Sequence, residues 1–182
     1  MKKLEDGFSM DKYGLHVRLV DENDAEFILK LRTDSKLSRF INSTIDNLEK
    51  QKEWIKKYKE KEREGKEYYF IYYYDNKPVG LNRIYDIHET DATGGSWVCK
   101  PGLPIELPVL ILIIVREIIF EMLDLCYDRY DIRKKNLKVL WINKLFDPAK
   151  VRETELDYFF ELPKETFELK KEYLLDLLNV KR

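Results

Sequence analysis

The chain has 182 residues, and its 33 Lys and Arg nearly balance its 34 Asp and Glu, which gives a formal net charge of −1. This length predicts one domain with its own hydrophobic core, and a composition that is 44% hydrophobic excludes an intrinsically disordered chain. Basic residues alternate with acidic ones instead of collecting on one element, which argues against a nucleic-acid-binding protein.

The number of cysteines and the N-terminal residues bear on the cellular compartment of the protein. Cys99 and Cys126 are too few to predict the disulfide framework of a small secreted protein. Met1 is followed by polar residues without the apolar stretch of a signal peptide, so we expect a cytoplasmic protein. Residues 1–14 are expected to be a flexible polar lead-in, followed by a single domain over residues 15–182.

The first predicted strand and helix lie between residues 15 and 34. Apolar and polar residues alternate over Leu15–Val20, which is the period of a half-buried strand. Asp21 is suited to cap a helix, because its carboxylate accepts hydrogen bonds from free N–H groups of the first turn. We expect this helix to end by Arg32–Asp34 and a loop to follow over Ser35–Ile45.

A second helix is predicted from a capping pattern. Asp46 followed by Glu49 resembles a capping box, with Asp in place of the usual Ser or Thr. The helix is expected to run to about Glu64. Gly65 then ends it, because glycine readily adopts the left-handed conformation that terminates helices.

Three strands are predicted next. Glu67–Tyr74 is rich in Tyr, Phe and Ile, which favour strands, and Pro78–Ile87 is a second strand that follows a turn at residues 75–77. These two strands are expected to form a hairpin. A loop is expected over Thr90–Gly95, and a third strand over Ser96–Lys100.

A long apolar helix is the strongest candidate for a membrane segment. It begins near Pro108, which is well placed in a first helical turn, and runs to about Leu125. A spanning helix needs about 20 mostly uncharged residues, whereas Arg116 and Glu117 interrupt this one. We therefore predict a buried central helix whose C-terminal half faces water, and no membrane partner.

Helices and strands continue to alternate toward the end of the chain. A short helix opened by Asn136 runs to about Phe146, a last strand covers Leu156–Leu162, and an amphipathic helix covers Glu165–Val180. Interleaved helices and strands with an internal hairpin predict an α/β fold in which helices flank a mixed sheet.

The order of these elements resembles the GNAT superfamily of acyl-CoA-dependent N-acyltransferases. The similarity extends over residues 15–162 and includes Tyr130-Asp131-Ile132-Arg133 ahead of the helix led by Asn136. The opening Val17-Arg18-Leu19-Val20 looks like that of the branch with ribosomal-protein alanine acetyltransferases and nucleotide-sugar amine acetyltransferases. The resemblance implies a central, mostly antiparallel twisted sheet and an acyltransferase that takes acetyl-CoA as co-substrate and uses no metal.

The resemblance also implies where acetyl-CoA binds. In that fold the cofactor lies between the splayed fourth and fifth strands, and its pantetheine arm bonds to the fourth strand like an added strand. The backbone positions that would take this role here are Trp97, Val98 and Cys99. Lys100, Gly102 and Asn136 are further candidate contacts, although Asn136 is equally suited to be only a helix cap.

The phosphate-binding glycines of the family have no counterpart in this chain. Ile105 and Leu107 stand where glycine is expected, and Glu106 adds a negative charge beside the phosphate position. Phosphate prefers free N–H groups at a helix N-terminus, and Pro104 removes one of them. This loop is therefore either a modified cradle for coenzyme A or only a turn that starts a helix.

Transfer of an acetyl group needs a neutral amine, so a base near the acceptor assists the reaction. Candidate bases gather where the second hairpin strand ends: Asp86, His88 and Glu89. Asn143 stands where the family often has a tyrosine that protonates the departing thiolate, and its amide is still able to donate a hydrogen bond to sulfur. Arg83 and Tyr85 are candidate contacts to the acceptor substrate.

Two classes of function remain open. The first is an acetyl-CoA-dependent N-acetyltransferase acting on a small amine, with an amino-sugar nucleotide as the first choice and a peptide N-terminus as the second. The other is a GNAT-like domain without catalysis that serves as a binding or scaffold protein. The tyrosine-rich strand Tyr68–Tyr74 is a candidate edge for pairing in a homodimer.

Overall fold

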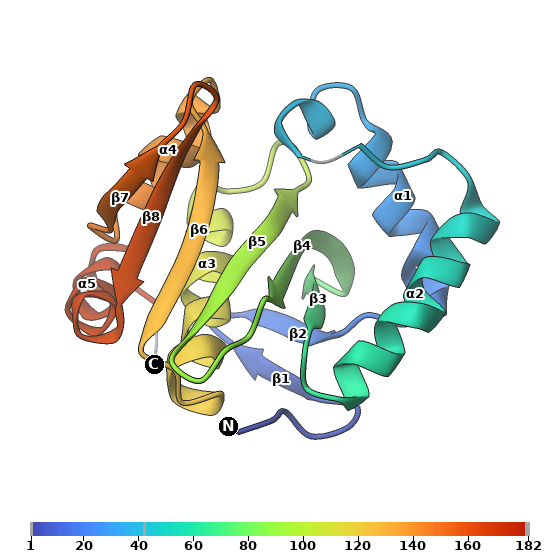
Figure 1. Cartoon of the computed structure of the whole chain (residues 1–182), viewed down its shortest axis with the longest axis horizontal. Helices are drawn as coiled ribbons and strands as arrows, with labels where there is room; N and C mark the ends of the chain where they lie inside the picture. Colours follow the sequence, from blue (N-terminus) through green and yellow to red (C-terminus); the bar gives the residue numbers. More distant parts are fainter. Residues whose placement is uncertain (1, 42, 181–182) are drawn as a thin grey trace.

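The computed structural model describes residues 2–41 and 43–180. Its strands are β1 (Ser9–Lys12), β2 (Leu15–Leu19), β3 (Tyr68–Tyr74), β4 (Lys77–Tyr85), β5 (Asp91–Cys99), β6 (Tyr127–Arg133), β7 (Ala149–Glu153) and β8 (Asp157–Pro163). They form one sheet of eight strands in the order β1-β2-β3-β4-β5-β6-β8-β7 (Figure 1). Neighbouring strands are antiparallel except β5 and β6, which run parallel.

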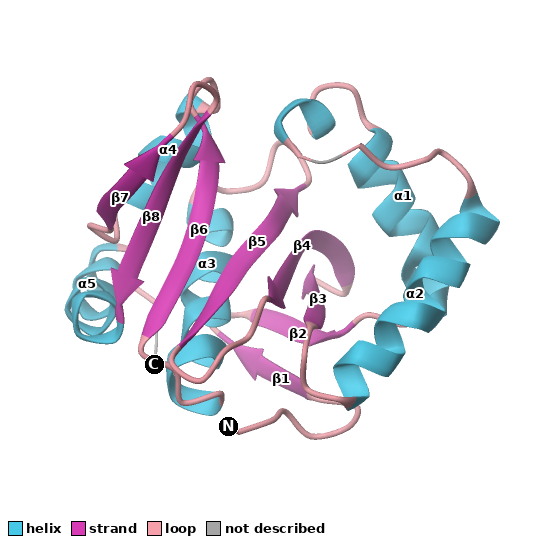
Figure 2. Cartoon of the chain, viewed as in Figure 1, coloured by secondary structure: helices cyan, strands magenta, loops and turns pink. Residues whose placement is uncertain are grey.

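Helices cover both faces of this sheet (Figure 2). They are α1 (Ala25–Thr33), α2 (Leu48–Arg63), α3 (Glu106–Glu117), α4 (Leu137–Lys144) and α5 (Lys164–Leu177). Buried residues of α1 and α2 pack in one core, and those of α3, α4 and α5 pack in another. Side chains of β3 alternate between the two cores, with Phe70 in one and Ile71 in the other. The α/β fold with a mixed, helix-flanked sheet is confirmed.

The lead-in predicted to be flexible contains a paired strand. β1 pairs with β2 across a two-residue turn, Tyr13-Gly14, whose φ angles are 55° and 75°. Positive φ at both central positions characterises the type I′ turn, whose twist matches that of the strands it joins. The signal is weak in the sequence, because tyrosine is an unusual residue for the first of these positions.

The loop predicted over Thr90–Gly95 is wrong, because β5 already begins at Asp91. Gly94 and Gly95 lie inside this strand, although glycine usually weakens a strand. Here they allow close approach: a Cβ at Gly95 would lie 2.6 Å from the Tyr85 hydroxyl oxygen.

The edges of the sheet also differ from expectation. β3 is paired with β2 on one side and β4 on the other, so the prediction that Tyr68–Tyr74 forms an edge for a homodimer is wrong. The outer strands are β1 and β7. All five residues of β7 are exposed, so this strand buries no side chain in either core.

The helix ends follow local rules. Asp21 forms a capping box with Asp24 at the start of the first helical turn, as its carboxylate predicted. The second helix is capped by Asn47, whose side-chain oxygen accepts a 2.9 Å hydrogen bond from the Lys50 amide, so the prediction of Asp46 is wrong by one residue. Gly65, with a φ of 73°, ends α2 as predicted.

α3 is the central helix, and it continues into a π-helical turn over Ile118–Met122. Arg116 and Glu117 at its C-terminal end are buried, with exposed fractions of 2% and 1%, whereas Glu121 and Asp124 just beyond it are exposed. The prediction that this half of the helix faces water is therefore wrong for Arg116 and Glu117 and correct only for Glu121 and Asp124. Among residues 2–41 and 43–180, the helices are too short or too polar to cross a membrane.

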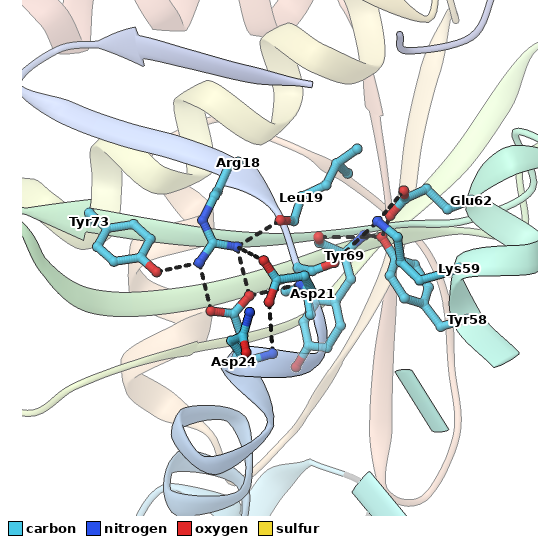
Figure 3. A network of polar contacts seen from close by, with 11 residues as sticks. Arg18, Leu19, Asp21, Asp24, Tyr58, Lys59, Glu62, Tyr69 and Tyr73 are labelled. Carbon is cyan, nitrogen blue, oxygen red and sulfur yellow. Dashed lines mark hydrogen bonds and ion pairs between the residues drawn. The ribbon is translucent and has the colours of Figure 1, made fainter. Parts of the chain in front are cut away.

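A polar network ties α1 to the sheet (Figure 3). Arg18 of β2 donates two hydrogen bonds of 2.7 Å to the two carboxylate oxygens of Asp24, and one of 2.6 Å to the Tyr73 hydroxyl of β3. A planar guanidinium is well matched to such a bidentate contact. The network positions α1, and hence the loop that follows it, against the sheet.

Candidate active site

β5 and β6 separate soon after they meet. Asp91 is in register with Tyr127 and Ala92 with Asp128, and the strands then diverge toward their carboxyl ends (Figure 1). β5 stays paired with β4 on its other side, and β6 with β8. We call the space between residues 93–99 of β5 and residues 129–133 of β6 the wedge.

A buried side chain ends the pairing of β5 with β6. The Asp128 carboxylate accepts a 2.9 Å hydrogen bond from the Gly94 amide. The side chain thus stands in for a backbone carbonyl, which leaves the donor satisfied but stops the ladder. Glycine is needed at this position, because a Cβ on Gly94 would lie 2.8 Å from that carboxylate oxygen.

A cavity that is partly open to solvent occupies the wedge. Leu112 and Val115 of α3 line it from one face of the sheet. Phe40 and Ile41, in the loop after α1, line it from the other face. The cavity therefore passes through the sheet, so two molecules that enter from opposite faces are able to meet in it.

β5 carries a bulge where it borders this cavity. Ser96 has a φ of 51°, and the register with β4 shifts next to Asn82. A bulge leaves an extra residue unpaired and re-aims its neighbours. Asn82 is 1% exposed, and its Oδ1 has no hydrogen-bond partner among the described residues. The cavity wall therefore offers a buried acceptor to a bound molecule.

An ion pair lies at the closed end of the wedge. Arg116 Nε is 3.0 Å from Asp128 Oδ2, and its Nη2 donates a 2.7 Å hydrogen bond to Asn143 Oδ1. The guanidinium carbon is 4.2 Å from the ring centroid of Phe146. The third nitrogen, Nη1, is buried and has no hydrogen-bond partner within normal geometry among the described residues. Arg116 lines the cavity together with Tyr130, whose ring centroid is 5.2 Å from the guanidinium carbon and whose hydroxyl also lacks such a partner. The sequence analysis missed Arg116 and Asp128 as site residues.

Both predicted asparagines border the cavity. Asn136 accepts a 3.4 Å hydrogen bond from the Val139 amide, so it caps α4 as predicted and also faces the ligand space. Asn143 is more constrained, because Arg116 occupies its oxygen and its nitrogen donates to the Val139 carbonyl at 3.0 Å. One amide hydrogen of Asn143 is left, so its hydrogen bond to sulfur stays a prediction.

Tyr85 and Asp131 line the outer part of the cavity and a shallower pocket next to it. Asp131 is exposed on β6, but partial desolvation of its carboxylate raises its pKa, and the negative charge of Asp157 acts in the same direction. Burial raises the pKa of Tyr85 as well, and the negative charge of Asp131 adds to this increase. A carboxylate with a raised pKa is suited to accept a proton from an amine. The sequence analysis did not single out Asp131.

The three bases predicted from the sequence lie around the turn between β4 and β5. Asp86 has a φ of 48° where β4 ends, and it lines the shallower pocket. His88 and Glu89 are exposed, and the His88 amide donates to the Asp91 carbonyl. None of these three residues lines the wedge cavity, whereas Asp131 does.

The predicted cofactor contacts on β5 divide between the two faces of the sheet. Trp97 lines the wedge cavity, whereas Val98 is buried in the core formed with α1 and α2. Burial raises the pKa of the Cys99 thiol to about 12. The wedge-side backbone edge at these positions lies beyond the last pair with β6, so a ligand arm is able to bond to it.

The loop before α3 offers few donors for phosphate. The Leu107 amide donates back to the Pro104 carbonyl, proline 104 has no N–H, and Glu106 is in the first turn of the helix. Gly102 is exposed in the preceding turn, with a φ of 77°. Pro104, Pro108 and the internal bond of the Leu107 amide therefore leave few free N–H groups at this end of α3.

Lys100 is the cationic side chain among the predicted cofactor contacts, and it directly precedes that loop in the sequence. Its amide donates to the Val79 carbonyl at 2.8 Å, and its ammonium lies 5.2 Å from the ring centroid of Phe27. The side chain therefore leans toward α1. Among the described residues, no group of His, Cys, Asp and Glu is arranged to hold a metal ion.

A second cavity lies next to the first. We call it the cationic pocket, because its lining includes Arg32, Lys50 and Arg83 beside Trp54, and no carboxylate among the described residues. Arg83 pairs with the buried Glu67 through a 2.9 Å hydrogen bond. Its guanidinium carbon is also 5.1 Å from the rings of both Trp54 and Tyr85, so Arg83 lies between the two cavities.

Solved structures with the same architecture are known. One described as apo FdhC, a nucleotide-linked sugar GNAT, is 32% identical, with a TM-score of 0.83 and coverage of 92% of this chain and 96% of that chain. The ribosomal-protein-S5-alanine acetyltransferase from Vibrio fischeri is 15% identical, with a TM-score of 0.74 over 85% and 95% of the two chains.

Spermidine N-acetyltransferase from Vibrio cholerae, in complex with CoA and spermine, is 13% identical, with a TM-score of 0.74 over 86% and 99% of the two chains. At 13% and 15% identity, the similarity to the two Vibrio proteins shows the fold alone. No family model and no curated protein matches this chain.

Proposed function

The chain belongs to the GNAT superfamily of N-acetyltransferases, and on this premise we propose that it transfers the acetyl group of acetyl-CoA to the amine of a nucleotide-linked amino sugar. The observation that carries the proposal is the wedge, whose cavity crosses the sheet between β5 and β6. A slender thioester arm on one face and an amine on the other meet there without displacing a strand.

The acyl donor pairs with the free edge of β5. An extended arm bonds to backbone groups of a strand edge in the same way as an added strand, and the residues beyond Ala92 are free of β6. The bulge at Ser96 turns backbone groups toward the cavity, where donors stabilise the negative charge that develops on the thioester oxygen.

The acceptor amine approaches from the face that carries Tyr85 and Asp131. An amine attacks only in its neutral form, so a proton acceptor at the entrance favours the reaction. Partial desolvation raises the pKa of Asp131, which makes this carboxylate a better proton acceptor than an ordinary aspartate.

The cationic pocket supports the choice of acceptor. Its cations Arg32, Lys50 and Arg83 suit the diphosphate of a nucleotide, and the half-exposed ring of Trp54 suits a base. The same pocket repels a polyamine, which is itself positively charged. The 32% identical structure is described as a nucleotide-linked sugar GNAT, which is consistent with this acceptor.

The test is thiol release from acetyl-CoA with a panel of acceptors: nucleotide-linked amino sugars, the same amino sugars without nucleotide, spermidine and peptides with a free N-terminus. We expect turnover with the nucleotide-linked amino sugars and weaker turnover once the nucleotide is removed. Preferred turnover of spermidine or of peptides would overturn this acceptor class.

A matched pair of lysines on α2 sharpens the test. Lys50 lines the cationic pocket, whereas Lys56 is exposed and pairs with Glu22 3.5 Å away. Lys50→Ala should raise KM for the nucleotide-linked acceptor without changing KM for the free amino sugar. Lys56→Ala should change neither value, so equal effects of the two substitutions would count against the pocket.

The loop before α3 favours a second candidate, a GNAT-like domain that no longer catalyses. Its shortage of phosphate donors predicts weak binding of coenzyme A. A thermal shift with acetyl-CoA decides between the two, because a ligand at 100 times its Kd stabilises the native state by about 2.7 kcal/mol. Absence of any shift at saturating acetyl-CoA would leave the binding or scaffold role.

A further inference from the structure

We propose that Arg116 stabilises the thiolate that leaves when acetyl-CoA is cleaved, so that its guanidinium acts as a catalytic residue in place of a proton donor. The inference rests on the proposed acetyltransferase function. Its basis is the buried ion pair at the closed end of the wedge and the one guanidinium nitrogen that this pair leaves unused.

Three side chains hold the Arg116 guanidinium in place. Asp128 of β6 lies 3.0 Å from Nε, Asn143 of α4 lies 2.7 Å from Nη2, and the ring centroid of Phe146 lies 4.2 Å from the guanidinium carbon. The Arg116 and Asp128 side chains are each 2% exposed. A charge held in this way needs no reorganisation when a second charge forms nearby, which is the condition for electrostatic catalysis.

Nη1 is the part of the group that is available for chemistry. It is buried, it lacks a hydrogen-bond partner among the described residues, and Arg116 lines the wedge cavity. A buried donor without a partner is costly, because it has lost its hydrogen bonds to water. A ligand atom that accepts a hydrogen bond at the closed end of the wedge removes this cost.

Arg133, Asn143 and Asp131, which also line the cavity, are less suited to this role. Arg133 is the second cation in the lining, but it is 40% exposed and pairs with Asp157 at 2.9 Å. Asn143 has no proton acidic enough to transfer to sulfur. Asp131 lies at the outer end of the cavity, where the proposed function assigns it to the amine. A thioester arm that enters at the open end of the wedge meets Arg116 at the far end.

The transfer step balances without a proton donor at sulfur. The amine nitrogen forms a bond to the thioester carbonyl carbon, the C–S bond breaks, and its electron pair stays on sulfur as a thiolate. The proton of the nitrogen goes to water in the cavity and through this water to Asp131. The thiolate is held by Arg116 Nη1 and takes its proton from solvent after release.

An equilibrium measurement tests this without turnover. Affinities of coenzyme A and of desulfo-coenzyme A, which lacks the sulfur, are compared by calorimetry at about pH 7 and about pH 9, on either side of the ordinary thiol pKa of about 8.5. Wild-type protein should favour coenzyme A increasingly as the pH rises. A ratio of affinities that does not change with pH would overturn the proposal.

The variants are chosen so that folding does not confound the result. Arg116→Met alone leaves Asp128 unpaired, so the double variant Arg116→Met/Asp128→Asn removes the guanidinium together with its buried counter-charge. Its affinity ratio should be independent of pH, and its kcat should fall about 100-fold with little change in the Kd of coenzyme A. Arg116→Lys, which keeps the charge, should retain part of both effects and serves if the double variant does not fold.

The matched control is Glu117→Gln, a buried charge on the same helix that lies away from the cavity. It should keep the wild-type affinity ratio and kcat, and equal losses in the two variants would reduce Arg116 to a structural role. If wild-type protein binds neither coenzyme A nor desulfo-coenzyme A, the proposed function itself fails. If it is active but Arg116→Met/Asp128→Asn keeps the wild-type kcat, only the inference on Arg116 fails.

Discussion

Arg116 and Glu117 are adjacent on α3 and equally buried, yet they meet different surroundings. Glu117 accepts a 2.7 Å hydrogen bond from the Tyr13 hydroxyl and pairs with Lys12 at 2.9 Å and Lys171 at 3.5 Å. Arg116 binds its partners at the closed end of the wedge and keeps one donor unused beside a cavity. Burial of a charge is therefore not what separates a functional site from a structural one; contact with a cavity is.

The largest effect on stability should come from Asp128→Ala. This change leaves Arg116 buried without its counter-ion, and breaking a buried ion pair in this way costs about 3–5 kcal/mol of unfolding free energy. Urea unfolding followed by circular dichroism measures it. Arg116→Met/Asp128→Ala should recover much of the loss, because no unpaired charge remains; a double variant as unstable as the sum of the singles would contradict the pairing.

Glu117→Gln should cost less, about 1.5–3 kcal/mol, the range for hydrogen bonds to a charged group. Lys12 keeps 32% of its side chain exposed and Lys171 keeps 14%, so both ammonium groups are able to turn to water when the carboxylate is removed. The same urea titration gives the value. A loss greater than that of Asp128→Ala would reverse the order expected from the two environments.

Tyr13→Phe removes one hydrogen bond from the Glu117 cluster and should cost about 0.5–1.5 kcal/mol. Burial, together with the hydrogen bond to Glu117, raises the pKa of Tyr13 well above its ordinary value. In the Glu117→Gln background the substitution should have little further effect, since its partner is already gone. Fully additive losses in the double variant would argue against this contact.

The smallest expected effect is a change of stability with pH on the Arg116 side. Burial raises the pKa of Asp128 above 3.8, although Arg116 and the Gly94 amide oppose the shift. The folded protein then holds more protons on this group than the unfolded chain, so its contribution to stability is complete below pH 3.8 and is lost as the pH rises through the folded pKa.

Asp128→Asn abolishes this titration. The unfolding free energy of wild-type protein minus that of Asp128→Asn should therefore fall as the pH is raised through that window. A difference that rises instead would mean that the ion pair with Arg116 outweighs burial.

Features that depend on near neighbours in the chain were predictable from the sequence. Asp21 caps the first helical turn, Gly65 ends α2 and residues 75–76 form the turn between β3 and β4, because capping and turn chemistry need only a few adjacent residues. The order of helices and strands followed from the same local signals, and with it the resemblance that located the space between two strands.

The contents of that space were not predictable in the same way. The Gly94 amide meets a carboxylate 34 residues away, and Arg116 meets an amide 27 residues away. The sequence therefore predicts a loop at Gly94 and Gly95, and it predicts that Arg116 and Glu117 lie on the side of the helix that faces water. The bases predicted near His88 were chosen by residue type, whereas Asp131 stands out only once β6 is seen to border a cavity.

The amino-acid sequence by itself determined the class of fold and most of the helix ends, since these depend on periodicity and local hydrogen bonding; the strand proposed to meet the ligand followed from the family resemblance. Tertiary structure alone decided that Asp128 opens the wedge, that Arg116 is buried at its closed end and that a cationic pocket adjoins it. The physical reason is that burial and ion pairing arise from the packing of distant segments, so a side chain's charge state and partners follow only from the assembled sheet.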